Sequence, residues 1–199
     1  MSNGISHLVV QALGKQSLPP NVVILCHYCN YQAQKEQSAV NIIGDLLAQV
    51  GEKVPAIESE IRRAFNEWKK RSDRSLQLPD MAQMFVDAIS SIRRAYICID
   101  AVDALPSENR SELLRTLQRI IQEAPNARLF LTTRPHIRPE LDQHLTKEAY
   151  VIDIVADQED IARYVTQEIR FLKYRDPGLV TENLEDDIRK VVSEEASRT

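Results

Sequence analysis

The stretch "YICIDAVDAL", residues 96–105, decides the fold that we predict for this chain. Four residues, of which Ile97, Cys98 and Ile99 are plainly apolar, lead directly into Asp100, and a second acid, Asp103, follows three positions later. A continuous apolar run of this kind is typical of a strand buried on both faces of a parallel sheet. Ligands gather at the carboxyl ends of the strands in such sheets. The two acids therefore mark a candidate site at a strand end.

Similar apolar runs recur along the chain and alternate with segments of helical spacing. Helices have apolar residues three and four positions apart, whereas buried strands read as short continuous runs. Strands that alternate with helices need crossover connections, and crossovers produce a parallel sheet covered by helices. We therefore expect an α/β fold, a three-layer parallel sheet flanked by helices. The predicted strands are 21–29, 95–100, 127–133 and 149–155. The predicted helices include 4–13, 35–50 and 55–70. Four more helices are predicted to follow Pro79, Ser107, Asp157 and Thr181, with Ser107 and Thr181 as N-caps.

Composition narrows the classes of function. The 199 residues carry a formal net charge of −4, which gives no electrostatic reason to expect a nucleic-acid partner. No apolar run approaches the roughly 18 residues of a membrane span, and the N-terminus has no basic region typical of a signal peptide. All three cysteines lie in apolar, strand-like segments, which favours buried thiols in a reducing compartment. We expect a cytoplasmic protein without a membrane partner.

The residues at two strand ends suggest chemistry, with an ordinary alternative for each. A carboxylate at the tip of a buried strand, such as Asp100, can hold Mg²⁺, and a second acid, such as Asp103, can orient a water. Arg134 follows the predicted strand 127–133, and its planar guanidinium matches phosphate oxygens. Equally, Asp is a common turn residue after a strand, and Arg before Pro is common in surface loops. Both interpretations stay open on spacing alone.

Four segments occur along the chain in the order "YCNYQAQKEQSAVNIIGDLLAQV", "AYICIDAVDALP", "RLFLTTRPH" and "IDIVADQEDIARYVTQEI". Their order and spacing resemble the NACHT domain of fungal STAND-type P-loop NTPases. More narrowly, they resemble its nephrocystin-like N-terminal group, which is often followed by ankyrin or WD repeats. The resemblance implies that "ICIDAVDA" is a Walker B motif, with Asp100 linked to Mg²⁺ and Asp103 orienting water, and that Arg134 is a sensor. It also implies Mg²⁺ with ATP or GTP as cofactors, and nucleotide-dependent switching with self-association in signalling.

The chain departs from this family pattern at two motifs. A Walker A loop should precede the helix at 4–13, and the only similar sequence, "LGKQS" at 13–17, has Val9 where the first glycine belongs and no strand before it. We therefore predict that Walker A is absent. Family members usually read Asp-Ala-x-Asp-Glu, whereas position 104 is Ala104. We expect a chain truncated at both ends that does not hydrolyse nucleotide.

These observations support one preferred function and one alternative. The preferred function is a fragment of a NACHT-type nucleotide-binding signalling switch, with residues 1–173 as a truncated core and 174–199 as the start of a C-terminal helical region. The alternative is a nucleotide-independent interaction module that pairs with full-length NACHT proteins. Protein partners, including copies of itself, are expected in both cases. The sequence leaves open whether the chain is a gene-model fragment, a remnant or a functional short form.

Overall fold

The described part of the chain forms two units. The structure, a computed structural model, describes residues 19, 21–33, 36–71, 76–145, 149–154 and 158–196. One unit extends to Ala149 and the other begins at Tyr150, and each is described by itself. The predicted helix at 4–13 and the "LGKQS" segment lie outside the described residues.

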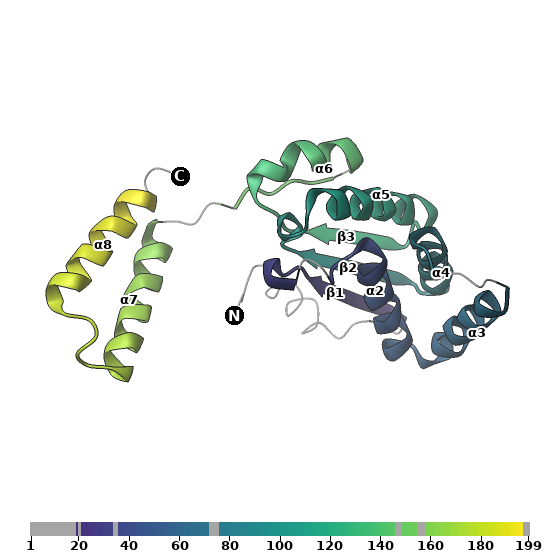
Figure 1. The fold of residues 1–199 in the computed structure, drawn as a ribbon, viewed down its shortest axis with the longest axis horizontal. Coiled ribbons are helices and arrows are strands. Elements are labelled where there is room, and N and C mark those ends of the chain that lie inside the picture. The colour runs from purple at the N-terminus through teal and green to yellow at the C-terminus, as the bar shows by residue number, and fades with distance from the viewer. Residues whose placement is uncertain are drawn as a thin grey trace. The chain divides into compact units, whose positions relative to one another are not determined.

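A three-stranded parallel sheet forms the centre of the first unit (Figure 1). Its strands are β1 (Val22–Tyr28), β2 (Arg94–Asp100) and β3 (Ala127–Leu131), in the order β1-β2-β3. The three strands that we predict first along the chain are therefore confirmed, together with an α/β fold in which helices flank a parallel sheet. Because β2 lies between the other two strands, its carboxyl end is bordered on both sides.

Helices and short turns connect the strands. Helix α2 starts where the Ser38 hydroxyl accepts a bond from the Asn41 N–H, an N-cap that satisfies an otherwise unpaired donor. Our prediction that Ser107 caps the next helix is wrong: Pro106 takes the cap position in an extended conformation, so the helix begins with Ser107. The elements are η1 (Tyr31–Ala33), α2 (Ala39–Lys53), α3 (Pro55–Arg71), α4 (Leu78–Ser90), η2 (Val102–Ala104), α5 (Ser107–Glu123), η3 (Pro135–Ile137) and α6 (Arg138–His144).

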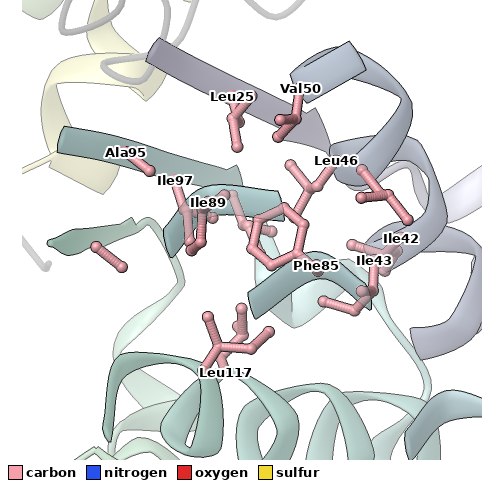
Figure 2. Close-up of a cluster of buried hydrophobic side chains, with 14 of the residues drawn as sticks. Leu25, Ile42, Ile43, Leu46, Val50, Phe85, Ile89, Ala95, Ile97 and Leu117 are labelled. Carbon is pink, nitrogen blue, oxygen red and sulfur yellow. The ribbon is translucent and has the colours of Figure 1, made fainter. Parts of the chain in front are cut away.

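The hydrophobic core lies between one face of the sheet and helices α2, α4 and α5. Alternate residues of the strands point to the same face, so Leu25 and Ile97 both enter this core. Phe85 of α4 is fully buried and lies among Leu46, Ile97 and Leu117 (Figure 2). Burial of each such side chain is worth about 1.5–3 kcal/mol. This packing holds β2, and so the acids at its end, in a fixed place.

Two glutamine side chains complete the backbone hydrogen bonding of β1 and the residues after it. The Gln49 amide of α2 donates to the Cys26 carbonyl at 2.8 Å and accepts from the Cys26 N–H at 2.9 Å. Gln37 does the same for Asn30, donating at 2.6 Å and accepting at 2.7 Å. Within the described residues β1 pairs with β2 alone. These glutamine side chains therefore form hydrogen bonds with backbone groups on the side of β1 that faces away from β2.

A partly buried ion pair fixes α6 against α5. The Arg110 Nε donates to Glu140 Oε2 at 2.7 Å, and the Ser111 hydroxyl donates to Glu140 Oε1 at 2.6 Å. Burial of Glu140 acts to raise its pKa, but the bonds from Ser111 and Arg110 and the Arg110 charge outweigh it and lower the pKa. Helix α6 begins four residues after Arg134, so this pair also anchors the segment that follows β3.

The prediction of a fourth strand, at 149–155, is wrong. Its described residues, 149–154, form no strand, and their side chains are exposed, with Tyr150 at 98% and Ile152 at 77%. The β-branched residues of this segment favour an extended backbone, but a strand exists only where a neighbouring strand accepts its hydrogen bonds. Within the described residues the sheet consists of β1, β2 and β3, and this segment pairs with none of them.

The second unit contains a pair of helices. These are α7 (Gln158–Arg175) and α8 (Glu182–Ala196), as the apolar spacing predicts. The Thr181 hydroxyl accepts from the Leu184 N–H at 3.3 Å, which confirms the predicted cap. Lys173 joins the helices through Glu185 at 2.6 Å. The domain boundary that we predict after residue 173 stays a prediction.

The lengths and charges of the helices bear on whether the chain could cross a membrane. A helix must be about 20 residues long and almost free of charge to cross the hydrocarbon layer. Within the described ranges, no helix meets both the length and the hydropathy that such a crossing needs.

Replacement of Gln49 tests the bonding at the β1 edge. Gln49→Ala removes the two hydrogen bonds to the Cys26 backbone, each worth about 0.5–1.5 kcal/mol, and an exposed 3.3 Å bond to Asp45, so we expect the free energy of unfolding to fall by about 1–2 kcal/mol in urea titrations. Gln122→Ala, at an exposed position on α5, is the matched control and should change stability by less than about 0.5 kcal/mol. Equal effects of the two replacements would contradict this account of the edge.

Replacement of Glu140 tests the α5–α6 ion pair. Glu140→Gln keeps the shape but removes the charge, so we expect a loss of about 1 kcal/mol at neutral pH. Because the folded-state pKa of Glu140 is lowered, the charge contributes stability above the unfolded-state pKa, and this contribution is lost as pH falls through the lowered value. The difference between wild type and Glu140→Gln should therefore shrink in acid. A difference that stays constant with pH would show that the charge is not involved.

Candidate functional site

Asp100 is held at the end of β2 by a residue from the neighbouring strand end. The Thr132 hydroxyl donates to Asp100 Oδ1 at 2.5 Å and accepts from the Ala101 N–H at 2.9 Å. Thr132 follows β3 directly, and the adjacent parallel strand places it beside the end of β2. A single hydroxyl thus fixes both the carboxylate and the backbone after it. Asp100 is partly buried, so this orientation is defined by the protein and not by solvent.

The backbone after Asp100 turns sharply and stays bonded to the β3 end. Ala101 has φ 54° and ψ 49°, in the left-handed region that side-chain-bearing residues rarely adopt. The Val102 N–H then donates to the Thr132 carbonyl at 3.0 Å, and the Thr132 N–H donates to the Ile99 carbonyl at 3.1 Å. Such strain, of the order of 1–3 kcal/mol, persists where surrounding bonds demand it and is common at functional sites.

Asp103 and Arg134 form the second contact across the strand ends. Asp103 Oδ1 accepts from the Arg134 N–H at 3.2 Å, and Arg134 Nε lies 3.4 Å from Asp103 Oδ2. The Asp103 side chain is 13% exposed, whereas that of Arg134 is 78% exposed. The structure therefore brings together all three residues that the sequence singles out. Their roles as metal ligand, water-orienting acid and sensor stay predictions.

Cys29 is a neighbour of the acids that sequence spacing did not assign to the site. Its N–H donates to the Asp100 carbonyl at 3.0 Å, directly after the end of β1. Burial, and then the charges of Asp100 and Asp103, raise the pKa of the Cys29 thiol to about 12. The signal for it was present in the sequence, because Cys29 follows an apolar strand just as Asp100 ends one.

Ala104, at the position where the family pattern has an acid, has a structural role. It lies in the turn η2, its N–H donates to the Ala101 carbonyl at 2.8 Å, and its methyl group packs against the hydrophobic core. The acidic pair at this strand end consists of Asp100 and Asp103.

The donor set fits Mg²⁺ only as one part of a coordination shell. Oxygen ligands suit this hard cation, which usually binds one or two carboxylates and takes its remaining ligands from water and substrate phosphates. Asp100, Asp103 and the Thr132 hydroxyl are all oxygen donors. Among the residues that the structure describes, no group of three or more His, Cys, Asp or Glu could hold a metal by itself. The strand ends therefore fit a metal that a phosphate ligand also holds.

Comparison with solved structures finds one that shares the fold and one with a weaker likeness. The Orc1 protein of Aeropyrum pernix, solved in complex with DNA, is 17% identical, with a TM-score of 0.53 over 84% of this chain and 40% of that one. A Walker-type ATPase of Pyrococcus abyssi is 14% identical, with a TM-score of 0.44 over 94% of this chain and 54% of that one. This chain thus spans about half or less of these structures' lengths. At these identities the likeness to the Orc1 protein shows the fold alone, an α/β fold with a parallel sheet.

Family comparison identifies the group to which the sequence belongs. No curated protein matches the chain. The family model described as nephrocystin 3, N-terminal, matches residues 4–134, more than half of the 199 residues, including Asp100, Asp103 and Arg134. The resemblance to the nephrocystin-like N-terminal group is thereby confirmed. This chain is a member of the nephrocystin 3 N-terminal family.

Proposed function

We propose that this chain is part of a nucleotide-dependent signalling switch of the NACHT type, and that residues 1–199 do not hydrolyse nucleotide by themselves. The observation that supports the proposal is the pair of acids at the end of the central strand, one bonded to Thr132 and the other to Arg134. Acids at this place in a P-loop NTPase-like fold are suited to a metal–phosphate ligand. The same site is incomplete as a hydrolytic centre.

Each residue has a defined part in binding. Mg²⁺ bound with ATP or GTP supplies charge neutralisation for the phosphates. Asp100 would hold the ion, and the Thr132 hydroxyl keeps that carboxylate in one orientation. Arg134 is largely exposed, so its guanidinium is free to bind a phosphate oxygen in place of Asp103. This exchange of partners would release Asp103 to orient water and would link the ligand to the segment after β3.

Two features explain why the proposal excludes hydrolysis by this sequence alone. Most of the phosphate grip in P-loop NTPases comes from backbone N–H groups and a lysine in a glycine-rich loop. The sequence has five glycines, and its single Gly-Lys pair, at 14–15, lacks the pattern of that loop. Position 104, moreover, provides a methyl group packed on the core and not a carboxylate.

Nucleotide and metal titrations test this proposal. With Mg²⁺ and either ATP or GTP, we expect no phosphate release above the buffer rate and a Kd weaker than about 1 mM by calorimetry. Mn²⁺, a paramagnetic substitute for Mg²⁺, should broaden the amide NMR signals around Asp100 and Thr132. Asp100→Asn keeps an acceptor for Thr132 and should abolish the broadening. Asp87→Asn, at an exposed acid on α4, should leave it unchanged.

Two results would contradict the proposal. Micromolar nucleotide binding that disappears in Asp100→Asn would show that these residues grip phosphate without the glycine-rich loop. Mn²⁺ broadening that Asp100→Asn leaves intact would show that the acidic strand end does not hold the ion.

A second function is favoured by the surface of the second unit. Among its described residues, Ile169 and Val180 are buried apolar side chains, while Phe171, Leu184 and Val191 are 53%, 43% and 57% exposed. A pair of helices with so small a core gains little stability from its own packing. These exposed side chains support the alternative function, a nucleotide-independent module that pairs with full-length NACHT proteins.

Co-purification distinguishes this alternative. The chain should bind a full-length relative equally well with and without Mg²⁺ and nucleotide. Replacing both Leu184 and Val191 by Ser should weaken binding about tenfold or more, since each buried apolar side chain is worth about 1.5–3 kcal/mol. Asp186→Ser, at an exposed position on the same helix, is the control. Binding that requires nucleotide, or that survives the double replacement, would count against the alternative.

A further inference from the structure

Two of the cysteines lie side by side on neighbouring strands. Cys26 of β1 and Cys98 of β2 are direct partners in the parallel register, so their side chains project from the same face of the sheet. Neighbouring strands lie roughly 4.8 Å apart. That spacing is within the Cα separation of about 4.4–6.8 Å that disulfides span. The backbone thus places two thiols where a covalent bond between them is possible.

The two thiols differ in environment and contact each other. Cys26 is partly exposed, whereas Cys98 is 2% exposed. A hydrogen bond from Cys98 outweighs the effect of burial and, with the nearby charge of Lys53, lowers the pKa of Cys26 to about 7. Cys26 is therefore the thiol of the pair that solvent reaches and that can act as the nucleophile.

The third cysteine is chemically different. Cys29 packs in the hydrophobic core with Leu25, on the helix-covered side of the sheet. Because side chains alternate along a strand, Cys29 lies on the face of the sheet opposite to Cys26. Cys29 therefore serves as an internal control for the reactivity of Cys26 and Cys98.

We propose that Cys26 and Cys98 form a peroxide-reactive thiol pair that closes reversibly into a disulfide between β1 and β2. The Cys26 thiolate attacks hydrogen peroxide, the O–O bond breaks, and Cys26 sulfenic acid and water form after protonation. The Cys98 sulfur then attacks the Cys26 sulfur, and the hydroxyl leaves as a second water with the Cys98 proton. Overall, two thiols are oxidised by two electrons and one peroxide is reduced to two waters. This inference does not depend on the proposed function.

The geometry explains why the disulfide would be reversible. Side chains of register partners in a parallel pair project side by side, so closure must draw the two Cβ atoms toward the roughly 3.8 Å typical of disulfides. Strained disulfides are the ones that thiols reduce readily. The backbone of Cys26 is meanwhile held by Gln49, and Cys98 is two residues before Asp100. Oxidation would therefore cross-link β1 to β2, the strand that carries the acids.

Peptide mapping of the peroxide-treated full chain tests the proposal. We expect the product to lose two hydrogens, to contain a Cys26–Cys98 linkage within one molecule, and to retain Cys29 as the single free thiol of three. Dithiothreitol should restore all three thiols. In the untreated protein, alkylation of Cys26 should reach half its maximal rate near pH 7, compared with the ordinary thiol value of 9.

Single replacements assign the two roles. Cys98→Ser should leave a Cys26 sulfenic acid that dimedone traps, Cys26→Ser should yield no trapped sulfenic acid, and Cys29→Ser should behave as wild type. Cys98→Ala provides a second test of the buried position, with circular dichroism and thermal unfolding to check folding. A linkage that includes Cys29, a disulfide between two molecules, or a wild-type chain that keeps three thiols under peroxide would each overturn the proposal, whatever the variants do.

Discussion

The parallel pairing of β2 between β1 and β3 is the constraint on which the other features depend. It aligns the carboxyl ends of all three strands, so that Thr132 reaches Asp100 from one side and the Cys29 N–H bonds the Asp100 carbonyl from the other. The same pairing puts Cys26 opposite Cys98 within the sheet. A slip of one residue in register would turn every side chain to the other face and separate these pairs. The candidate site and the Cys26–Cys98 pair thus both depend on the register of the three strands.

The acids at the end of β2 hold the local structure together as well as forming a candidate site. Asp100 accepts from Thr132, and Asp103 accepts from the Arg134 backbone, so together they tie the turn after β2 to the segment after β3. Family membership therefore does not by itself imply catalysis, because a strand end of this kind can persist for its structural bonds. Chemistry requires, in addition, groups that hold phosphate and activate water. Ala104, packed on the core, provides neither.

Local patterns predicted the elements well where the sequence signal and the packing agreed. Apolar runs located β1, β2 and β3, and the acids at the strand ends pointed to the candidate site, because both signals depend on residues close in sequence. The segment 149–154 was mispredicted for the opposite reason: its β-branched residues signal a strand, but pairing depends on a neighbour that periodicity cannot supply. Cys29 was missed as a neighbour of the acids because its bonding partner, Asp100, is distant along the chain.

The thiol pair shows how the same buried sheet can carry chemistry that sequence spacing conceals. The spacing of Cys26 and Cys29 resembles a metal motif, yet strand alternation turns them to opposite faces, and Cys29 packs in the core. The partner of Cys26 is Cys98 on the neighbouring strand, 72 positions later in the sequence. The register of β1 and β2 places these two residues side by side. A disulfide between Cys26 and Cys98 would restrain β1 against β2, and the acids lie at the end of β2. Oxidation could therefore affect ligand binding only by changing the position of that strand end. Register, and not proximity in sequence, connects the two sites.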